Sequence, residues 1–332
     1  MKRIFFILIS TLLLMTLSSA QTNNISEMTT KEKVAQMFMV QGDKFHQEYL
    51  DLGIGGYFLN SQNSKENYSN PIKQYNNSKI KPFFATDLEG YWNTLNSFYE
   101  SKSFGEVRNK TEAYELGVSH AKILKEIGFN WDFSPVVETK NTVWINRSFT
   151  GNNSEINDKI SSYIKGLEEN DIMATAKHYP GGNLLKNPHF FKVKVSAENL
   201  ELDKFSAAIN ANVSSIMVGH TIVNKKQSTV DKQIISELKE KFDGIIITDA
   251  ITMLGLKISY IFRQKKMIED LILAGSDVIL YTSVKPFGPT PKKVTKYINY
   301  ISEEIEKGKI DINQIDKSVE KILKYKGYEV VN

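Results

Sequence analysis

The sequence predicts an α/β fold, specifically a single (β/α)8 barrel, and two observations lead to that prediction. Short apolar segments typical of buried parallel strands alternate with longer segments that have the spacing and charge pattern of amphipathic helices. Several apolar segments also end on a polar or ionisable residue, most clearly Gly-Ile-Ile-Ile-Thr-Asp, which ends at Asp249. Barrel enzymes place their chemical groups at the C-terminal ends of the strands, so the same pattern predicts a site.

Strands are expected at eight places, namely residues 36–40, 56–59, 82–86, 130–136, 172–178, 215–220, 244–249 and 277–281. Helical patterns lie between them, for instance at residues 111–127, 154–169, 197–210, 234–242 and 264–274. Eight such repeats suit one barrel. A doubly wound open sheet is the alternative, but it needs a glycine-rich phosphate turn after the first strand, and Gln41-Gly42-Asp43-Lys44 is not one.

Residues 1–20 are expected to be a secretory signal peptide, which leaves residues 21–332 as one barrel domain. Lys2 and Arg3 precede the apolar stretch 4–17, and Ser18-Ser19-Ala20 supplies small residues for cleavage. The apolar stretch is shorter than the ~18 to 20 residues that cross a bilayer, so no membrane anchor is expected after cleavage. We therefore expect an exported protein, located in the periplasm or the medium.

Composition excludes several classes of function. The chain has no cysteine, so neither disulfide bonds nor a lipidated cysteine is expected. The 42 basic and 38 acidic residues give a net charge of +4 without a basic stripe, which argues against nucleic-acid binding. No metal and no organic cofactor are expected, because the sequence has no cofactor motif and its histidines show no metal-binding spacing: His46, His120, His178, His189 and His220.

Polar residues at or after the ends of the predicted strands are expected to meet at one mouth of the barrel. They are Asp87, Glu138, Arg147, Lys177, His178, His220 and Asp249. Each has a structural alternative, because an aspartate at a strand end is often a helix N-cap and a lone histidine is often a hydrogen-bonded core residue. Several such residues converging on one mouth favour a functional site.

These residues lie in motifs that resemble glycoside hydrolase family three, in particular its single-domain β-N-acetylglucosaminidase branch. Ala176-Lys-His-Tyr-Pro-Gly181 is similar to the family's Lys-His-Phe-Pro-Gly motif, and Asp243-Gly-Ile-Ile-Ile-Thr-Asp-Ala-Ile-Thr-Met253 is similar to its nucleophile region. Less specific similarities are found at residues 31–37, Gly53-Ile-Gly-Gly56, Thr86-Asp-Leu-Glu-Gly90 and Asn146-Arg-Ser-Phe149. The resemblance covers nearly the whole chain after residue 20.

The resemblance implies a retaining β-N-acetylhexosaminidase that forms a covalent glycosyl-enzyme intermediate on Asp249. This carboxylate must stay ionised, which a nearby cation such as Lys177 would favour. Asp87, Arg147, Lys177 and His178 match positions that hold sugar hydroxyls, and His220 is expected to form a hydrogen-bonding wall. The implied partner is a carbohydrate, a β-linked amino sugar of peptidoglycan or glycan fragments.

The resemblance assigns the general acid/base to His189, and here the sequence departs from the family. The family has an Asp-Ser-His motif, whereas this chain has Asn187-Pro188-His189. An amide can still accept a hydrogen bond from Nδ1, but it cannot stabilise an imidazolium as a carboxylate does. The loop at residues 180–190 is expected to act as a hinged flap that brings His189 over the pocket of Asp249.

These departures leave alternatives open. Tyr91 and Trp92 stand where the family has a glycine followed by arginines, and they form either a stacking platform for a sugar or packing against an outer helix. The alternative to an active enzyme is a catalytically impaired member that binds glycan or acts as a scaffold. A further alternative is that another carboxylate, Glu89 or Glu138, supplies the proton.

Overall fold

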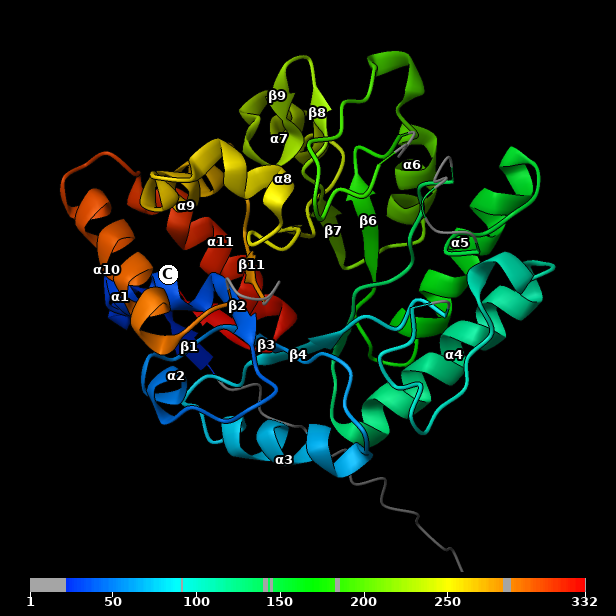
Figure 1. Cartoon of the computed structure of the whole chain (residues 1–332). Coiled ribbons are helices and arrows are strands. Elements are labelled where there is room, and N and C mark those ends of the chain that lie inside the picture. Colours follow the sequence, from blue (N-terminus) through cyan, green and yellow to red (C-terminus); the bar gives the residue numbers. More distant parts are fainter. Residues whose placement is uncertain are drawn as a thin grey trace, which may run out of the picture.

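The computed structural model of the chain describes residues 22–90, 92–139, 143, 146–182, 186–282 and 288–331. The predicted signal peptide and Tyr91 lie outside these ranges. Figure 1 shows strands gathered at the centre of the molecule and helices surrounding them. The chain therefore has the α/β architecture that its alternating segments predicted.

The central strands form two parallel sheets. They are β2 (Phe38–Gln41), β3 (Gly56–Phe58), β4 (Phe83–Thr86), β5 (Trp131–Asp132), β6 (Thr175–Tyr179), β7 (Ser215–Val218), β10 (Ile245–Thr248) and β11 (Ile279–Tyr281). One sheet has the order β11-β2-β3-β4-β5 and the other has the order β10-β7-β6. Parallel bridges connect the two sheets, Trp131 with Met173 on one side and Ile247 with Val278 on the other.

Each predicted strand overlaps one of these strands, although their boundaries differ, and two of the differences have a clear physical reason. β2 begins at Phe38 rather than at residue 36, because the preceding helix α1 (Thr30–Gln36) continues to Gln36 and uses Met37 as its C-cap. β5 covers only part of the predicted segment 130–136. Pro135 in that segment has no N–H to donate, which interrupts the regular ladder before a single bridge pairs Val136 with Lys177.

The other helices cover the outside of the strands. They are α2 (Gln47–Asp51), α3 (Lys65–Tyr75), α4 (Lys110–Ile127), α5 (Asn153–Glu168), α6 (Leu202–Asn210), α7 (Lys232–Lys239), α8 (Leu254–Lys257), α9 (Gln264–Ala274), α10 (Pro291–Glu306) and α11 (Ile312–Tyr325). The helix predicted at residues 197–210 is shorter than expected, because Leu200 is extended and separates a 3-10 turn from α6. No helix in the described ranges has the length and apolar character that a membrane crossing requires.

Apolar side chains between the strands and the helices form the core. In α10, buried residues recur every three or four positions, as at Val294, Ile298, Ile301 and Ile305. Burial of each such side chain contributes ~1.5 to 3 kcal/mol, which outweighs the weak intrinsic helix propensity of β-branched residues. The helices are therefore held in place by their apolar faces, and the strand ends remain available for polar groups.

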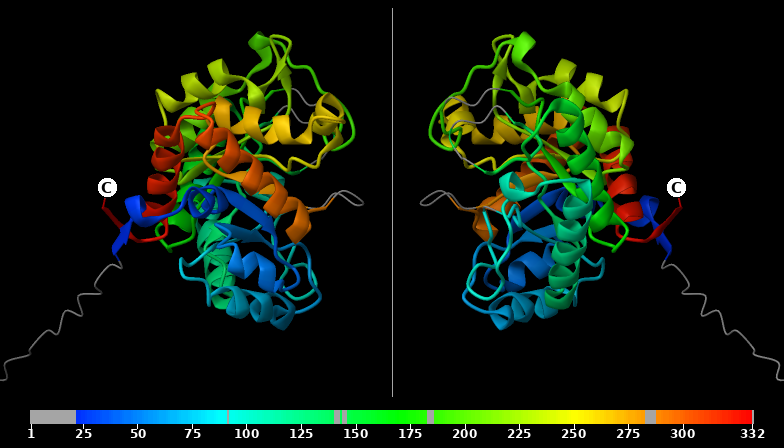
Figure 2. Two further views of the ribbon diagram at one scale, coloured as in Figure 1. Left: turned by 90° about the vertical axis from the view of Figure 1, so that its left-hand side faces the viewer. Right: turned by 90° about the vertical axis from the view of Figure 1, so that its right-hand side faces the viewer.

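Four short strands were not predicted. β1 (Thr22–Asn24) pairs in parallel with β12 (Glu329–Val331), and Figure 2 shows these two ends of the described chain side by side. β8 (Ile222–Val223) and β9 (Lys226–Gln227) form a hairpin after β7. Strands of two or three residues carry too little periodicity to be recognised in a sequence.

Gly55, immediately before β3, is a point of close approach between α1 and the sheet. Its N–H donates to the Ala35 carbonyl at 3.0 Å, and its carbonyl accepts the Phe83 N–H at 3.0 Å. A Cβ at this position would lie 1.9 Å from the Gln36 carbonyl oxygen. Because the obstructing atom belongs to the backbone, relief requires movement of α1 or β3.

We expect Gly55→Ala to lower the free energy of unfolding by at least ~3 kcal/mol, since overpacking against backbone cannot be relieved by a rotamer change. Gly308→Ala is the matched control: Gly308 has a φ of 71° but no heavy atom within 4 Å of an added Cβ. That substitution should cost about 1 to 2 kcal/mol from backbone strain alone. Urea unfolding followed by circular dichroism measures both, and equal losses would contradict the steric argument.

Candidate active site

A cavity of about 400 Å³ lies at the C-terminal ends of the central strands. Its lining includes every site residue predicted from the sequence: Asp87, Arg147, Lys177, His178, His189, His220 and Asp249. Asp87 follows β4, Lys177 and His178 belong to β6, and Asp249 follows β10. The structure thus brings together side chains that are far apart in the sequence, such as Asp87 and Asp249.

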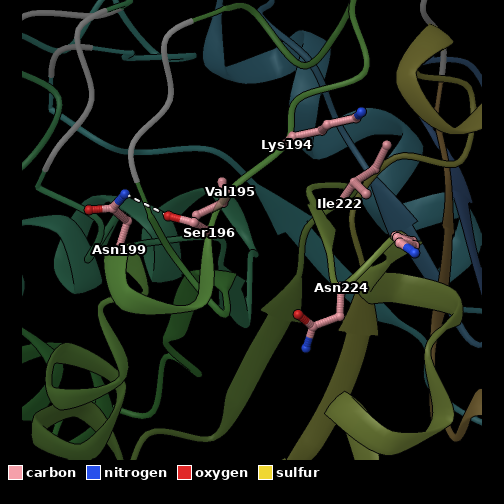
Figure 3. A pocket seen from close by; sticks show the side chains of 7 residues that line it. Lys194, Val195, Ser196, Asn199, Ile222 and Asn224 are labelled. Atoms are coloured by element: carbon pink, nitrogen blue, oxygen red, sulfur yellow. Dashed lines mark hydrogen bonds between the residues drawn. The ribbon is translucent and has the colours of Figure 1, made fainter.

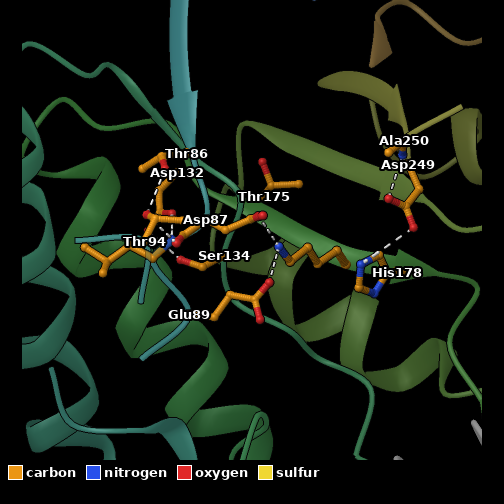
Figure 4. Close-up of polar contacts among 12 residues, drawn as sticks. Thr86, Asp87, Glu89, Thr94, Asp132, Ser134, Thr175, His178, Asp249 and Ala250 are labelled. Carbon is orange, nitrogen blue, oxygen red and sulfur yellow. Dashed lines mark hydrogen bonds and ion pairs between the residues drawn. The ribbon is translucent and has the colours of Figure 1, made fainter. Parts of the chain in front are cut away.

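A cluster of four charged side chains forms one wall of this cavity. The Lys177 ammonium group lies 2.7 Å from Oδ1 of Asp87 and 2.5 Å from Oε1 of Glu89. Arg147 donates to Glu89 through Nε at 2.6 Å and through Nη2 at 3.0 Å. Figure 4 shows the carboxylates of Asp87 and Glu89 directed at the same side-chain nitrogen. We call Asp87, Glu89, Arg147 and Lys177 the ion cluster.

The charges of the ion cluster depend on one another because they are buried. Burial alone raises the pKa of Glu89, but Arg147 and Lys177 outweigh this effect and lower the pKa to about 2. Burial lowers the pKa of Lys177, but Asp87 and Glu89 outweigh that effect and raise it. Removing one member of a buried ion pair typically costs about 3 to 5 kcal/mol, because an uncompensated charge remains.

His178 lies between two carboxylates. Its Nδ1 is 3.0 Å from Oε1 of Glu138, and its Nε2 is 3.9 Å from Oδ2 of Asp249. Figure 4 shows the imidazole directed at Asp249. Because Glu138 accepts the hydrogen bond, Nδ1 carries the hydrogen, and the ring is held in one orientation at the edge of the cavity.

Asp249 is held in place by backbone contacts on both sides. Its N–H donates to the Val218 carbonyl at 3.0 Å, and its Oδ1 accepts the Ala250 N–H at 2.7 Å. Burial raises the pKa of Asp249, but the neighbouring imidazoles of His178, His220 and His189 outweigh it, so the pKa is lowered. The carboxylate is therefore ionised at neutral pH.

The sequence suggested that Lys177 would keep Asp249 ionised, and this expectation is wrong. The Lys177 ammonium group is engaged by Asp87 and Glu89, and the lowered pKa of Asp249 comes from imidazoles. The physical reason is geometric: these two neighbours on β6 have different partners, and of the two it is His178 whose ring nitrogen lies 3.9 Å from Oδ2 of Asp249. Lys177 thus faces the ion cluster while His178 faces Asp249.

His220 forms part of the cavity wall. Its Nε2 donates to the Ala250 carbonyl at 3.1 Å, immediately beyond Asp249 in the sequence. Burial lowers the pKa of His220, so the imidazole is neutral near neutral pH. Near neutral pH it therefore contributes a hydrogen-bonding surface, and it gains a charge only at lower pH, where that charge opposes protonation of Asp249.

His189 lines the same cavity from the segment between β6 and α6. Its carbonyl accepts the Leu254 N–H at 3.0 Å, which connects this segment to the first residue of α8. Its backbone N–H donates to Oδ1 of Asn187 at 2.9 Å. Asn187 thus accepts from the backbone of His189 and not, as the sequence suggested, from the ring. Burial lowers the pKa of His189, although Asp249 opposes this effect.

The two other carboxylates that were considered as proton donors are poorly placed for that role. Glu89 has a pKa of about 2 and is fully buried between Arg147 and Lys177, so it carries no proton to donate near neutral pH. Glu138 is occupied by the Nδ1 hydrogen of His178, whose ring separates it from Asp249. His189 remains the candidate.

Asp132 at the end of β5 helps to position the ion cluster, and sequence reasoning missed this residue. This fully buried carboxylate accepts the Leu88 N–H at 3.0 Å and the Ser134 hydroxyl at 2.6 Å. Leu88 lies between Asp87 and Glu89, so Asp132 positions the turn that carries both acidic members of the ion cluster. A carboxylate inside an apolar predicted strand was the signal available in the sequence.

Asp132 also ends a buried chain of hydrogen bonds. The Tyr163 hydroxyl lies 3.3 Å from Oδ2 of Asp132 and 2.7 Å from Nδ1 of His120, and Nε2 of His120 lies 2.7 Å from the Ser101 hydroxyl. Burial lowers the pKa of His120 to about 3, so this histidine is a neutral member of the chain. These contacts connect α4 and α5 to the strand end that carries Asp132.

Comparison with known proteins places these residues in a family. Residues 29–325 match the model described as "Glycosyl hydrolase family 3 N terminal domain". The chain belongs to glycosyl hydrolase family 3. The resemblance seen in the sequence motifs is thereby confirmed.

Two curated relatives are similar to this family 3 chain. A Cellulomonas fimi protein named "Beta-N-acetylglucosaminidase/beta-glucosidase" is 22% identical over 91% of this chain and 58% of its own length. "Beta-hexosaminidase A" of Pseudoalteromonas piscicida is 25% identical over 82% of this chain and 53% of its own length. The chain thus spans little more than half of either relative.

A solved structure shows the same fold. The β-N-acetylhexosaminidase of Beutenbergia cavernae matches with a TM-score of 0.80 at 17% identity, over 91% of this chain and 99% of that one. Because the match covers nearly all of that chain, a chain of similar extent adopts this architecture.

A second hollow of about 570 Å³ lies beside the β8–β9 hairpin (Figure 3). It is lined by Lys194, Val195, Ser196, Asn199, Ile222, Asn224 and Lys225. This lining contains two lysines but neither a carboxylate nor an imidazole, so it offers no acid/base pair. In the part of the chain that the structure describes, no group of three or more acidic or histidine side chains is arranged to hold a metal ion.

Asp132 makes stability depend on pH in a defined direction. Burial raises its pKa from 3.8 to about 7, so the folded state binds this proton more tightly than the unfolded chain does. Its contribution to stability is therefore complete below pH 3.8 and is lost as the pH rises through about 7. The side chain in Asp132→Asn cannot titrate, so the stability of this variant lacks the pH dependence that comes from Asp132.

We expect the free energy of unfolding of the wild type, relative to Asp132→Asn, to fall between pH 4 and pH 8 by on the order of 4 kcal/mol. Urea titrations of both proteins at the two pH values measure the difference. Other buried acids, such as Glu168, are present in both proteins and cancel. A difference that stays constant with pH would show that Asp132 does not titrate in this range.

Proposed function

We propose that this chain is a retaining glycoside hydrolase, an exo-acting β-N-acetylhexosaminidase on peptidoglycan or glycan fragments. One observation carries the proposal: Asp249 is held ionised in a cavity that also contains the imidazole of His189 and the ion cluster. A nucleophile, a proton donor and a polar sugar-binding wall are the parts that such a reaction needs. The names of the two relatives, a β-N-acetylglucosaminidase/β-glucosidase and a β-hexosaminidase, support the amino-sugar class.

In the first step, an Asp249 carboxylate oxygen attacks the anomeric carbon. The bond from that carbon to the glycosidic oxygen breaks, its electron pair goes to the oxygen, and His189 gives the oxygen its proton. The leaving group departs as a neutral alcohol, and the sugar is bound to Asp249 as an ester. The ionised state of Asp249 in the free protein favours this attack.

In the second step, neutral His189 takes a proton from water while the water oxygen attacks the anomeric carbon. The bond to Asp249 breaks and its electron pair returns to the carboxylate, which restores the starting protonation states. Two inversions at the same carbon retain the β configuration. Asp87, Arg147, Lys177 and His178 would hold the sugar hydroxyls throughout, with the carboxylate accepting and the cations donating.

A glycan-binding protein with slow or no turnover is the second candidate, and one observation favours it. Residue 187 is an amide, and it accepts the backbone N–H of His189 rather than stabilising a charged ring. An uncharged partner leaves the imidazolium less stable than a carboxylate would. The geometry of Asp249 favours the enzyme, because a binding protein has no need for an ionised carboxylate at this place.

We further propose that the two sheets form one closed eight-stranded barrel and that residues 1–20 direct export and are removed. The parallel bridges on both sides of the sheets, at Trp131–Met173 and Ile247–Val278, support closure. The basic, apolar and small-residue order of residues 1–20 supports export to the periplasm or the medium.

The role of Asp249 can be tested by trapping the intermediate. We expect 5-fluoro-β-N-acetylglucosaminyl fluoride to add one sugar mass to the intact protein, because fluorine slows both steps while the good leaving group allows the first. Peptide mass spectrometry should place the adduct on Asp249. Asp249→Asn should form no adduct and should lose at least ~10³-fold in kcat for an aryl β-N-acetylglucosaminide.

Asp243→Asn is the control for this experiment, since Asp243 lies just before β10 but is exposed. It should form the adduct as the wild type does. Absence of both an adduct and turnover in the wild type, across a panel of β-glycosides, would favour the glycan-binding alternative.

The acid role of His189 predicts a pH dependence. A general acid must hold its proton, so kcat/KM should fall as the pH rises through the pKa of His189, which burial keeps below the ordinary value of 6.5. His189→Gln should abolish this limb of the profile. It should reduce kcat/KM by ~10²-fold or more for a poor leaving group, and much less for dinitrophenol, which departs without a proton. Equal losses with both leaving groups would exclude the acid role.

Asn187→Asp should move the same limb to higher pH. A carboxylate two residues before His189 stabilises the imidazolium, and an opposite charge at close range raises a pKa by roughly 1 unit or more. Asn187→Gln, which changes length without adding charge, is the matched control and should not move the limb upward. The pH profiles of kcat/KM for the three proteins decide between these outcomes.

A further inference from the structure

Two large aromatic side chains line the candidate active-site cavity while remaining half exposed. Trp92 is 54% exposed and Phe190 is 53% exposed, and both belong to the cavity lining. Most other large aromatic side chains in the described ranges, such as Trp131 and Phe133, are buried. Exposed aromatic area at the edge of a cavity is costly in water and is typical of surfaces that a ligand covers.

Phe190 is held beside the candidate acid/base. It follows His189 directly, and its N–H donates to the Asn187 carbonyl at 3.2 Å. The segment rests on α8, because a Cβ at Gly255 would lie 2.8 Å from the carbonyl oxygens of both Pro188 and Phe191. Only a glycine allows this approach, so the close contact with Gly255 fixes the backbone around Phe190 against α8.

Trp92 is held by the turn that carries Asp87 and Glu89, the two acidic members of the ion cluster. Its carbonyl accepts the Glu89 N–H at 3.0 Å, and an antiparallel bridge pairs Leu88 with Asn93. The Asn93 side-chain amide donates to the Tyr99 carbonyl at 2.6 Å. Trp92 lines the cavity while about half of its surface stays exposed, which favours the stacking alternative of the two that the sequence left open for this residue.

The chemistry of the proposed reaction says what these aromatic faces meet. A general acid must contact the glycosidic oxygen, so the leaving group departs from the face of the sugar opposite Asp249 and lies next to His189. Phe190 is the next residue after His189 and lines the same cavity. The face of a pyranose ring presents C–H groups that pack on an aromatic ring while its hydroxyl edge stays in water.

We propose that Trp92 and Phe190 form the binding platform for a second pyranose ring, the sugar from which the terminal residue is cleaved. The proposal rests on the proposed glycosidase function and adds to it the class of leaving group. The substrate is then a β-linked disaccharide or the end of a longer glycan, in preference to a glycoside with a small or acyclic leaving group.

The test compares two substrates that differ only in the leaving group. One is the β-1,4-linked disaccharide of N-acetylglucosamine, and the other is β-N-acetylglucosaminyl fluoride, which has no second ring. We expect Trp92→Ala and Phe190→Ala each to reduce the ratio of kcat/KM for the disaccharide to kcat/KM for the fluoride by roughly three- to tenfold. Trp92→Phe and Phe190→Tyr keep an aromatic face and should restore most of that ratio.

Phe262→Ala is the matched control, because Phe262 is 94% exposed but does not line the cavity. Its ratio should equal that of the wild type. If Trp92→Ala and Phe190→Ala lower kcat/KM for both substrates equally, the platform is excluded and the residues act only on the structure of the site.

Failure of the proposed function would appear differently, as a wild type that hydrolyses neither substrate. In that case the platform is tested by calorimetric titration of the disaccharide and of N-acetylglucosamine. A platform requires the wild type to bind the disaccharide more tightly than the monosaccharide and requires Trp92→Ala and Phe190→Ala to remove that preference. Equal affinity of the wild type for the two sugars would overturn the proposal.

Discussion

The buried Lys177 ammonium group, held between Asp87 and Glu89, is the interaction on which the arrangement of the site depends. A cation that is almost entirely shielded from water is stable only next to compensating charge, and Arg147 completes a balanced set by pairing with Glu89. Asp87 and Glu89 follow the end of β4, Arg147 lies in the loop after β5, and Lys177 belongs to β6 itself. Their pairing therefore fixes three segments relative to one another. Asp132 also holds the turn that carries Asp87 and Glu89, because it accepts the Leu88 N–H.

This balance separates two electrostatic environments within one cavity. The two positive and two negative charges of the ion cluster compensate one another, so the cluster has little effect on the pKa of Asp249. The imidazoles around Asp249 set its ionisation instead, and His178 joins the two regions because it follows Lys177 on the same strand. Two successive residues of β6 therefore contact different parts of one cavity, since Lys177 pairs with Asp87 and Glu89 while His178 lies 3.9 Å from Asp249.

The sequence predicted most of the fold and the members of the site, but few of their contacts. Apolar segments that end on Asp249 or His220 revealed the strands, and parallel strands bring such ends to one face, so co-location followed from topology. The ion pairs within the site could not be predicted in this way, because they depend on which side chain each charged group faces. Glu89 was considered as a proton donor and proves to be an ion-pair partner. Asp132 was missed because its partners, Leu88 N–H and Ser134, are not recognisable as a motif.

Asn187 stands where the family resemblance predicts an aspartate, and the contacts that position His189 do not require a carboxylate there. The segment that carries His189 is positioned by backbone contacts to α8 and by the close approach at Gly255, neither of which needs a carboxylate. Asn187 accepts the His189 N–H as an aspartate would, so the local turn is preserved. We expect the missing charge to act on the protonation of the imidazole. The substitution is therefore expected to alter the pH range in which His189 can donate a proton, rather than the position from which it donates.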